Sequence, residues 1–248
     1  PPEAYTEASI ASAAGLCDTN TKKNWKAPTG MIGIDYDAGD RTLTYAKVSW
    51  GYKAGGMNGT ECNSVYDPEY LTSYEAGVKT VVADGQILAN LATYYYDYKD
   101  IQFVTYIANS ARILNAGSAK IFGVELEYAI RPDFAPGLQL DGSVSYQDSK
   151  YGAGCFADPA NLNNAAFLSD PQQACPATVI NPNTGQAVPI GASADIKGNQ
   201  LIRAPRWKAN VGLQYSTDVA DFGNLLARVD AAWSARTYND VLNSKTPG

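Results

Sequence analysis

Residues 121–130 read Ile-Phe-Gly-Val-Glu-Leu-Glu-Tyr-Ala-Ile, and this stretch decides the fold. Apolar side chains occupy every second position from Phe122 to Ile130, whereas Glu125 and Glu127 fall between them. A period of two places successive side chains on opposite faces of an extended chain. The stretch therefore predicts a β-strand with one apolar face and one polar face.

The same alternation recurs along the rest of the chain and predicts eight strands in all. Five further segments alternate clearly, at residues 42–53, 71–82, 138–147, 206–215 and 225–238. Residues 25–37 alternate weakly, and residues 86–100 have apolar groups on both faces. The two outermost segments are expected to present unpaired edges.

The connections between these segments are of two kinds that alternate along the chain. Compact turns rich in Gly, Pro and Asp occur at 39–40, 84–85, 133–137 and 219–224. Most of the other connections are long, at 1–23, 55–70 and 152–204, and residues 105–111 form a shorter one. The pattern predicts an up-and-down sheet with short turns at one end and long loops at the other.

Composition excludes several classes of function. A net charge of -6 without a basic run argues against a nucleic-acid partner, because phosphate binding needs a basic surface. The absence of histidine removes the usual general base and most catalytic zinc sites, so the chain is not expected to be an enzyme. A mean hydropathy of -0.25 without a run of eighteen apolar residues excludes a helical membrane span but not a membrane barrel.

A soluble β-sandwich also alternates apolar and polar residues, so it is the main alternative fold. Strands of ten or more residues match the length that crosses a bilayer, and the turns and loops are segregated. The aromatic residues of the apolar face gather at two levels, as in membrane girdles. They are Trp50, Tyr52, Tyr74, Tyr146, Trp207 and Trp233 near the loops, and Tyr36, Tyr128 and Tyr215 near the turns.

These features predict an all-β fold, an antiparallel up-and-down transmembrane β-barrel segment of about eight strands with short periplasmic turns and long extracellular loops. Lipid then contacts the apolar face, and the polar face lines the lumen. The charged residues expected there keep the interior wet or pair across strands. They are Lys47, Glu75, Lys79, Glu125, Glu127, Asp141, Arg206, Lys208, Arg228 and Asp230.

All four cysteines fall in the long loops, which fits disulfides on an oxidising face of a membrane protein. Proximity in sequence favours Cys155 with Cys175 and Cys17 with Cys62, although four cysteines permit three connectivities. No metal site is expected, because the chain lacks both histidine and a CxxC spacing.

Several segments together make the chain resemble the TonB-dependent outer-membrane receptors. They are GYKAGGMN at 51–58, PEYLTSYEAGVK at 68–79, YYYDYKD at 94–100, NAG at 115–117 with GVELE at 123–127, and RAPRW at 203–207. They occur in order over nearly the whole chain. The resemblance implies that residues 1–248 are part of one receptor barrel domain, without the plug domain, the TonB-binding segment and the terminal strands.

The resemblance further implies a receptor in the cell outer membrane of a Gram-negative bacterium, surrounded by outer-membrane lipid. Such a receptor works with the TonB complex, through the missing N-terminal region, in energy-coupled uptake of a scarce nutrient. A ferric siderophore is the leading expectation, a cobalamin or a carbohydrate is an alternative, and no cofactor is implied. A passive diffusion channel and an adhesive barrel are rival interpretations.

In the family, loops and the upper barrel wall hold the substrate together with the plug. The residues that this implies as ligand contacts are Tyr52, Lys53, Asn58, Tyr66, Tyr106, Arg112 and Tyr151. For each of them, packing within the loops is the alternative role.

Overall fold

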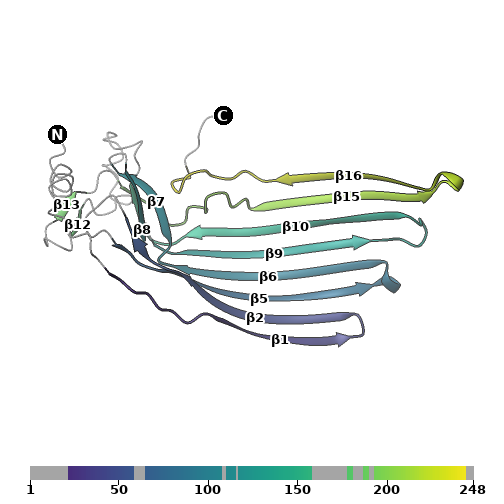
Figure 1. Cartoon of the computed structure of the whole chain (residues 1–248), viewed down its shortest axis with the longest axis horizontal. Coiled ribbons are helices and arrows are strands. Elements are labelled where there is room, and N and C mark those ends of the chain that lie inside the picture. The colour runs from purple at the N-terminus through teal and green to yellow at the C-terminus, as the bar shows by residue number, and fades with distance from the viewer. Residues whose placement is uncertain are drawn as a thin grey trace.

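One antiparallel sheet of eight long strands dominates the computed structural model, which describes residues 22–58, 65–107, 110–115, 117–157, 178–180, 187–189 and 193–243. Each strand pairs with the next long strand along the chain, so the sheet is an up-and-down meander (Figure 1). Its strands are β1 (Gly30–Gly39), β2 (Thr42–Lys53), β5 (Glu69–Val82), β6 (Ile87–Lys99), β9 (Ala119–Ile130), β10 (Leu138–Tyr151), β15 (Trp207–Asp218) and β16 (Asn224–Ser234).

The sheet is open, with β1 and β16 at its two edges. All residues of both strands are exposed, in agreement with the edges expected from the sequence. Among the described residues, no helix has the length and apolar character needed to cross a membrane.

The connections segregate to opposite ends of the sheet, as the sequence predicts (Figure 1). At one end lie short turns, two of which contain the single-turn helices η1 (Ala83–Gly85) and η3 (Ala220–Phe222). Gly85 and Gly137 adopt positive φ angles of 100° and 86° there, a conformation that glycine tolerates without a steric penalty. At the other end lie the long connections.

Within the described parts of the long connections, four small two-stranded ladders occur. They pair β3 (Gly56–Met57) with β4 (Val65–Tyr66), β7 (Gln102–Ile107) with β8 (Ser110–Asn115), β11 (Cys155–Ala157) with β14 (Ser193–Asp195), and β12 (Thr178–Ile180) with β13 (Ala187–Pro189).

Several sequence expectations differ from the structure. The last strand, expected to reach residue 238, ends at Ser234. The first strand begins at Gly30, five residues later than expected, because residues 25–29 precede the first pairing with β2. The short loop expected at 105–111 is wrong, since the β7–β8 hairpin crosses that segment and the connection extends from Asp100 to Ser118. Each strand of this hairpin has six residues, which is too short for the alternation of apolar and polar residues to distinguish it from a loop.

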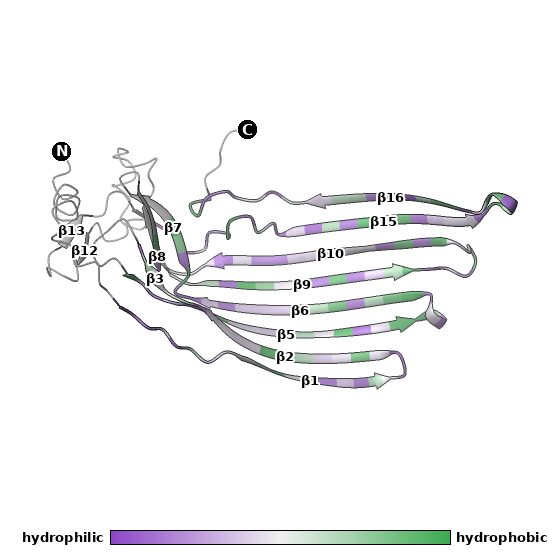
Figure 2. Ribbon diagram, in the orientation of Figure 1, coloured by the Kyte–Doolittle hydropathy of each residue, from purple (hydrophilic) through white to green (hydrophobic). Residues whose placement is uncertain are grey.

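Hydrophobic and hydrophilic residues follow one another along the long strands (Figure 2). The register joins the alternating faces of neighbouring strands into continuous rows. One row on the apolar face runs Ile32, Val48, Tyr74, Tyr95 and Phe122. One row on the opposite face runs Lys47, Glu75, Tyr94, Gly123 and Gln147. The sheet therefore has one apolar and one polar face, as a barrel wall between lipid and lumen requires.

Candidate functional site

The polar face of β2 and β5 has an ion pair beside a tyrosine. Lys47 Nζ lies 3.0 Å from Glu75 Oε1, and the Tyr45 hydroxyl donates a 2.8 Å hydrogen bond to the same carboxylate. The ammonium groups of Lys47 and Lys79 lie 5.9 and 5.7 Å from the Tyr45 ring centroid. A Cβ at Gly77, the register partner of Tyr45, would collide with this ring. The glycine thus lets the ring lie flat on the next strand.

A second tyrosine repeats this arrangement further along the polar face. The ring of Tyr94 on β6 covers Gly123 on β9, where an added Cβ would overlap it. Its hydroxyl donates to Gln147 Oε1 at 3.5 Å, which joins β6 to β10 across β9. The polar face is therefore stiffened by side chains that reach over glycines into the next strand.

A charged cluster spans β10, β15 and β16 near the short turns. The guanidinium of Arg228 makes two 2.9 Å hydrogen bonds to the two carboxylate oxygens of Asp141, and its Nη2 lies 2.7 Å from Asp230 Oδ1. Gly212 on the intervening strand pairs with both Asp141 and Asp230, and a Cβ there would clash with Arg228. The pairing expected among the charged residues of this face is confirmed for these three.

At the loop end, the side chain of Asn115 joins two connections. Its Nδ2 donates 2.8 Å hydrogen bonds to the carbonyls of Asp67 and Asp100, and its Oδ1 accepts a 2.7 Å bond from the Asp67 amide. Asn115 begins the NAG segment of the family resemblance. Its amide ties the β7–β8 hairpin to the end of the 54–68 connection.

Gln102, at the start of the same hairpin, makes parallel contacts. Its Nε2 donates to the carbonyls of Ala54 (2.9 Å) and Asp67 (3.0 Å), and its backbone amide donates to Glu69 Oε2 at 2.9 Å. Two residues of β7–β8 thus hold both ends of the 54–68 connection.

An ion pair fixes Asp67 from its other side. Lys23 Nζ lies 2.8 Å from Asp67 Oδ1, and this hydrogen bond holds the pKa of the Asp67 carboxyl below its usual range. Lys23 therefore favours the charged form of Asp67.

Asn58 makes a third link between these connections. It is 8% exposed, its Nδ2 donates to the Ile113 carbonyl at 2.9 Å, and its Oδ1 accepts from the Ile113 amide at 2.8 Å. Because both ends of the amide meet backbone groups of β8, Asn58 holds the loop to the hairpin as a backbone ladder would.

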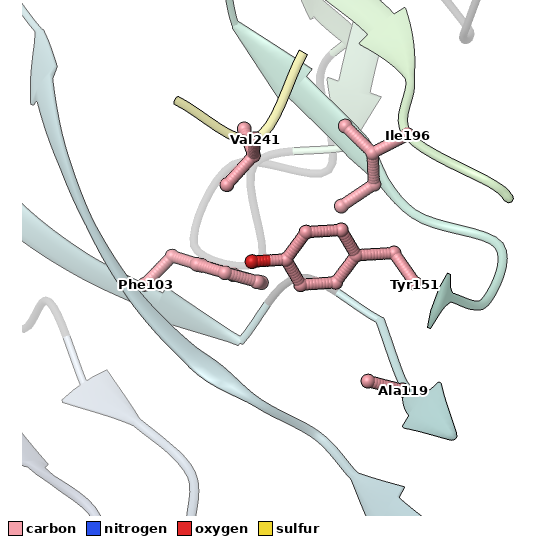
Figure 3. Close-up of a cluster of buried hydrophobic side chains, with 5 residues drawn as sticks. All are labelled: Phe103, Ala119, Tyr151, Ile196 and Val241. Carbon is pink, nitrogen blue, oxygen red and sulfur yellow. The ribbon is translucent and has the colours of Figure 1, made fainter. Parts of the chain in front are cut away.

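The loop end also contains the buried apolar cluster of the described residues (Figure 3). The Tyr151 ring packs edge-to-face on Phe103 with centroids 5.4 Å apart. Ala119, Ile196 and Val241 complete the cluster, so it draws on β7, β9, β10 and the segments before β15 and after β16. The loop end is thus a packed unit, whereas both sheet faces lie open.

Polar side chains also fix the segments flanking β15 and β16 to each other. Asn199 Nδ2 donates to the Val241 carbonyl at 3.0 Å, and Asn243 exchanges hydrogen bonds of 2.7 and 2.8 Å with the backbone of Gln200. Sequence reasoning missed these amide links and those of Gln102 and Asn115. Their signal is the recurrence of Asn and Gln in the connections between the long strands.

The structure distributes the expected ligand contacts over different environments. Lys53 is exposed, with its ammonium 4.0 Å from Glu69, and Tyr66 is half-buried in β4. Tyr52 stacks on Tyr70 with centroids 6.4 Å apart, and its register row belongs to the apolar face. Asn58 and Tyr151 are buried within the loop end. These five residues therefore lie in different environments of the described structure.

Other expectations lie partly outside the described residues. Tyr106 and Arg112 lie on β7 and β8, but their side chains are not described. Cys17, Cys62 and Cys175 lie outside the described residues, and Cys155 is described only as the first residue of β11. Within the described part of the chain, no group of three or more Cys, Asp or Glu side chains is arranged to hold a metal ion.

One charged residue differs from its expected face. The guanidinium of Arg206 lies 3.7 Å from Asp148 Oδ1, and Asp148 pairs in register with Phe122 of the apolar face. Arg206 precedes β15, so the strand alternation does not fix its direction.

Comparison with known families supports the barrel interpretation. The sequence pattern of the family described as TonB dependent receptor-like, beta-barrel matches residues 5–248. The metal-pseudopaline receptor CntO of Pseudomonas aeruginosa is 29% identical over 134 residues, which are 54% of this chain and 18% of that protein. The pesticin receptor of Yersinia pestis is 33% identical over 125 residues, which are 48% of this chain and 18% of that protein.

Solved structures show the same fold. The ferric yersiniabactin uptake receptor FyuA from Yersinia pestis aligns with a TM-score of 0.60 at 24% identity, covering 87% of this chain and 27% of that one. The ferric preacinetobactin receptor BauA from Acinetobacter baumannii aligns with a TM-score of 0.55 at 15% identity, covering 87% and 26%. The chain thus spans about a fifth to a quarter of the length of the proteins that it matches. All four are named as receptors and none as an enzyme.

Proposed function

Since this chain belongs to the TonB-dependent receptor-like β-barrel family, we propose that it forms part of the wall and extracellular loops of an outer-membrane receptor that imports a metal chelate. The observation that carries the proposal is the family match over residues 5–248 together with an open sheet whose two faces differ in polarity. Outer-membrane lipid contacts the apolar face, and the polar face lines the pore.

The substrate class follows from the relatives. A metal-pseudopaline receptor and a ferric yersiniabactin uptake receptor both bind metal chelates by name, and each is similar to this chain. We therefore place a ferric siderophore or a related metal chelate first, ahead of a cobalamin or a carbohydrate. A passive channel is not favoured, because the family is one of energy-coupled receptors.

In this proposal, parts of the receptor outside this chain complete the transporter. A plug domain fills the lumen, further strands pair with β1 and β16, and an N-terminal segment binds the TonB complex. The disulfides Cys155–Cys175 and Cys17–Cys62 restrain the extracellular loops. The family supports the plug, the further strands and the TonB-binding segment, and the placement of the cysteines in long loops supports the disulfides.

Among the expected ligand contacts, position in the fold separates two roles. Lys53 is exposed at the top of β2, and Tyr66, Tyr106 and Arg112 lie in the loop hairpins, so we assign substrate contact to these four. Asn58 and Tyr151 are buried and position the loops, and the stacking of Tyr52 on Tyr70 suits the lipid boundary. Contact with an anionic chelate suits the two cationic side chains.

Uptake by the full-length receptor tests the proposal. Cells with the receptor gene deleted are complemented with the wild type and supplied with ⁵⁵Fe-loaded siderophores, labelled cobalamin and labelled oligosaccharides. Accumulation of one iron chelate should require both the receptor and TonB. Accumulation that persists without TonB would favour a passive channel, and selective accumulation of cobalamin or sugar would replace the substrate class.

A further inference from the structure

Three lysines lie next to one another on the apolar face, close to the loop end. Lys120 on β9 is the direct register partner of Lys150 on β10 and, on its other side, of Asp97 on β6. Lys99 follows Asp97 by two residues on β6, so it projects from the same face and lies diagonal to Lys120. All three lysines are exposed.

The register assigns these lysines to the lipid-facing side of the sheet. Phe122 and Tyr95 lie two residues from Lys120 and Asp97 on the same face, and they pair with each other in the apolar row. On the opposite face at this level, Ala119 and Tyr151 are buried in the loop-end cluster. The lysines therefore point away from the lumen and the loop cluster.

Aromatic rings lie directly beside this lysine group on the same face. Tyr74 and Tyr95 are in contact with ring centroids 6.3 Å apart, and Tyr52 and Tyr70 stack two rows closer to the loops, where Tyr70 is the register partner of Lys99. Tyrosine rings concentrate where the hydrocarbon ends and the headgroups begin. The lysines therefore lie at the level of the headgroups on the side of the long loops.

The charges of this patch do not balance within the protein. Lys120 and Lys150 are directly opposite on neighbouring strands, where Cβ atoms are about 5 Å apart and like charges repel. Asp148 binds Lys150 at 2.6 Å and lies 3.7 Å from Arg206, and Asp97 faces Lys120. The two carboxylates of Asp97 and Asp148 balance only two of the four basic groups, so two positive charges remain at the lipid boundary. The four basic groups are Lys99, Lys120, Lys150 and Arg206.

We propose that Lys99, Lys120 and Lys150 bind the phosphorylated headgroup of a glycolipid in the outer leaflet of the membrane. A phosphate between Lys120 and Lys150 offsets their mutual repulsion, and the acyl chains of the lipid lie along the adjacent aromatic row. The inference rests on the proposed membrane location of the receptor. It adds a lipid site that is separate from the substrate path through the lumen.

A titration of the purified full-length receptor tests this site. Diphosphoryl lipid A is added to the receptor in non-ionic detergent, and its Kd is measured by native mass spectrometry. The test variant combines Lys120→Gln with Lys150→Gln, and the matched control combines Lys22→Gln with Lys197→Gln, two exposed lysines outside the patch. Far-UV circular dichroism and heat-modifiable electrophoretic mobility verify that each variant is folded.

The test variant should bind diphosphoryl lipid A about 30-fold more weakly, since each lysine near a membrane surface contributes roughly a factor of five. The control should stay within about twofold of the wild type, and the charge-preserving pair Lys120→Arg and Lys150→Arg should retain binding. Removing both phosphates from the lipid should abolish the difference between variant and wild type.

Equal lipid A affinity in test variant and wild type would overturn the inference. The inference would also be overturned if millimolar inorganic phosphate competed as effectively as the lipid, because the site would then recognise free phosphate. Membrane fractionation distinguishes a failure of the lipid-site inference from a failure of the proposed function. A receptor absent from the outer membrane refutes the function, whereas one that is present with unchanged lipid affinity refutes only the lipid site.

Discussion

Replacing Asn115 with alanine should release the 54–68 connection from the β7–β8 hairpin. The substitution removes three hydrogen bonds, two that the side chain donates to the carbonyls of Asp67 and Asp100 and one that it accepts from the Asp67 amide. Each such bond contributes about 0.5–1.5 kcal/mol net, and these are exposed, so a value in the lower half of the range, about 0.7 kcal/mol, applies to each. The loss is about 2 kcal/mol in the free energy of local opening.

Hydrogen exchange of the full-length receptor measures this opening. A loss of about 2 kcal/mol corresponds to roughly 30-fold faster exchange of the Asp67 amide and its neighbours. Asn224→Ala is the matched control, because Asn224 hydrogen-bonds to Asp218 at the short-turn end and should leave the loop end unchanged. Unchanged exchange at 65–69 in Asn115→Ala would refute the view that the hairpin holds this loop.

Two further predictions concern the charged contacts. Gly212→Ala places a Cβ against the Arg228 guanidinium, and should lower the free energy of unfolding in micelles by about 1–3 kcal/mol, whereas Gly51→Ala, with open space beside it, should not produce this loss. Equal free energies of unfolding for the two variants would contradict the expected clash between a Cβ at position 212 and Arg228. The hydrogen bond from Lys23 lowers the pKa of Asp67 in the folded state, so its contribution is complete above the ordinary pKa of 3.8 and is lost as the pH falls through the lowered value. Exchange at 65–69, corrected for intrinsic rates, should stay constant from pH 7 to about 4.5 and rise only in stronger acid. Lys23→Met should speed exchange at neutral pH and reduce the rise in acid, because the pKa of Asp67 is then closer to its ordinary value.

Most of the sheet was predictable from residue order alone. In β9 the alternation of Phe122, Val124 and Leu126 with Glu125 and Glu127 sets the two faces, and register carries them to neighbouring strands. The short turns were equally predictable, because Gly and Pro mark backbone conformations that other residues resist.

The contacts at a distance were not predictable in the same way. Arg228 and Asp141 were both expected on the polar face, but their bidentate pairing joins residues 87 positions apart across Gly212. Nothing local indicates that this glycine leaves room for a guanidinium from the next strand.

The loop end shows the same limit more strongly. Tyr151 was expected to contact ligand, yet it is buried against Phe103 on a hairpin that sequence periodicity did not reveal. Burial there depends on several connections meeting, and the sequence of one connection does not indicate which others it meets.

The central claim is that the strand at 121–130 is a membrane wall with lipid on one side only. Spin labels placed singly at residues 121–130 of the full-length receptor in liposomes test it by their collision rate with dissolved oxygen, which concentrates in hydrocarbon. The account predicts maxima at Phe122, Val124 and Leu126 and minima at Gly123, Glu125 and Glu127. A profile without a period of two, or one with its maxima at the glutamates, would contradict it.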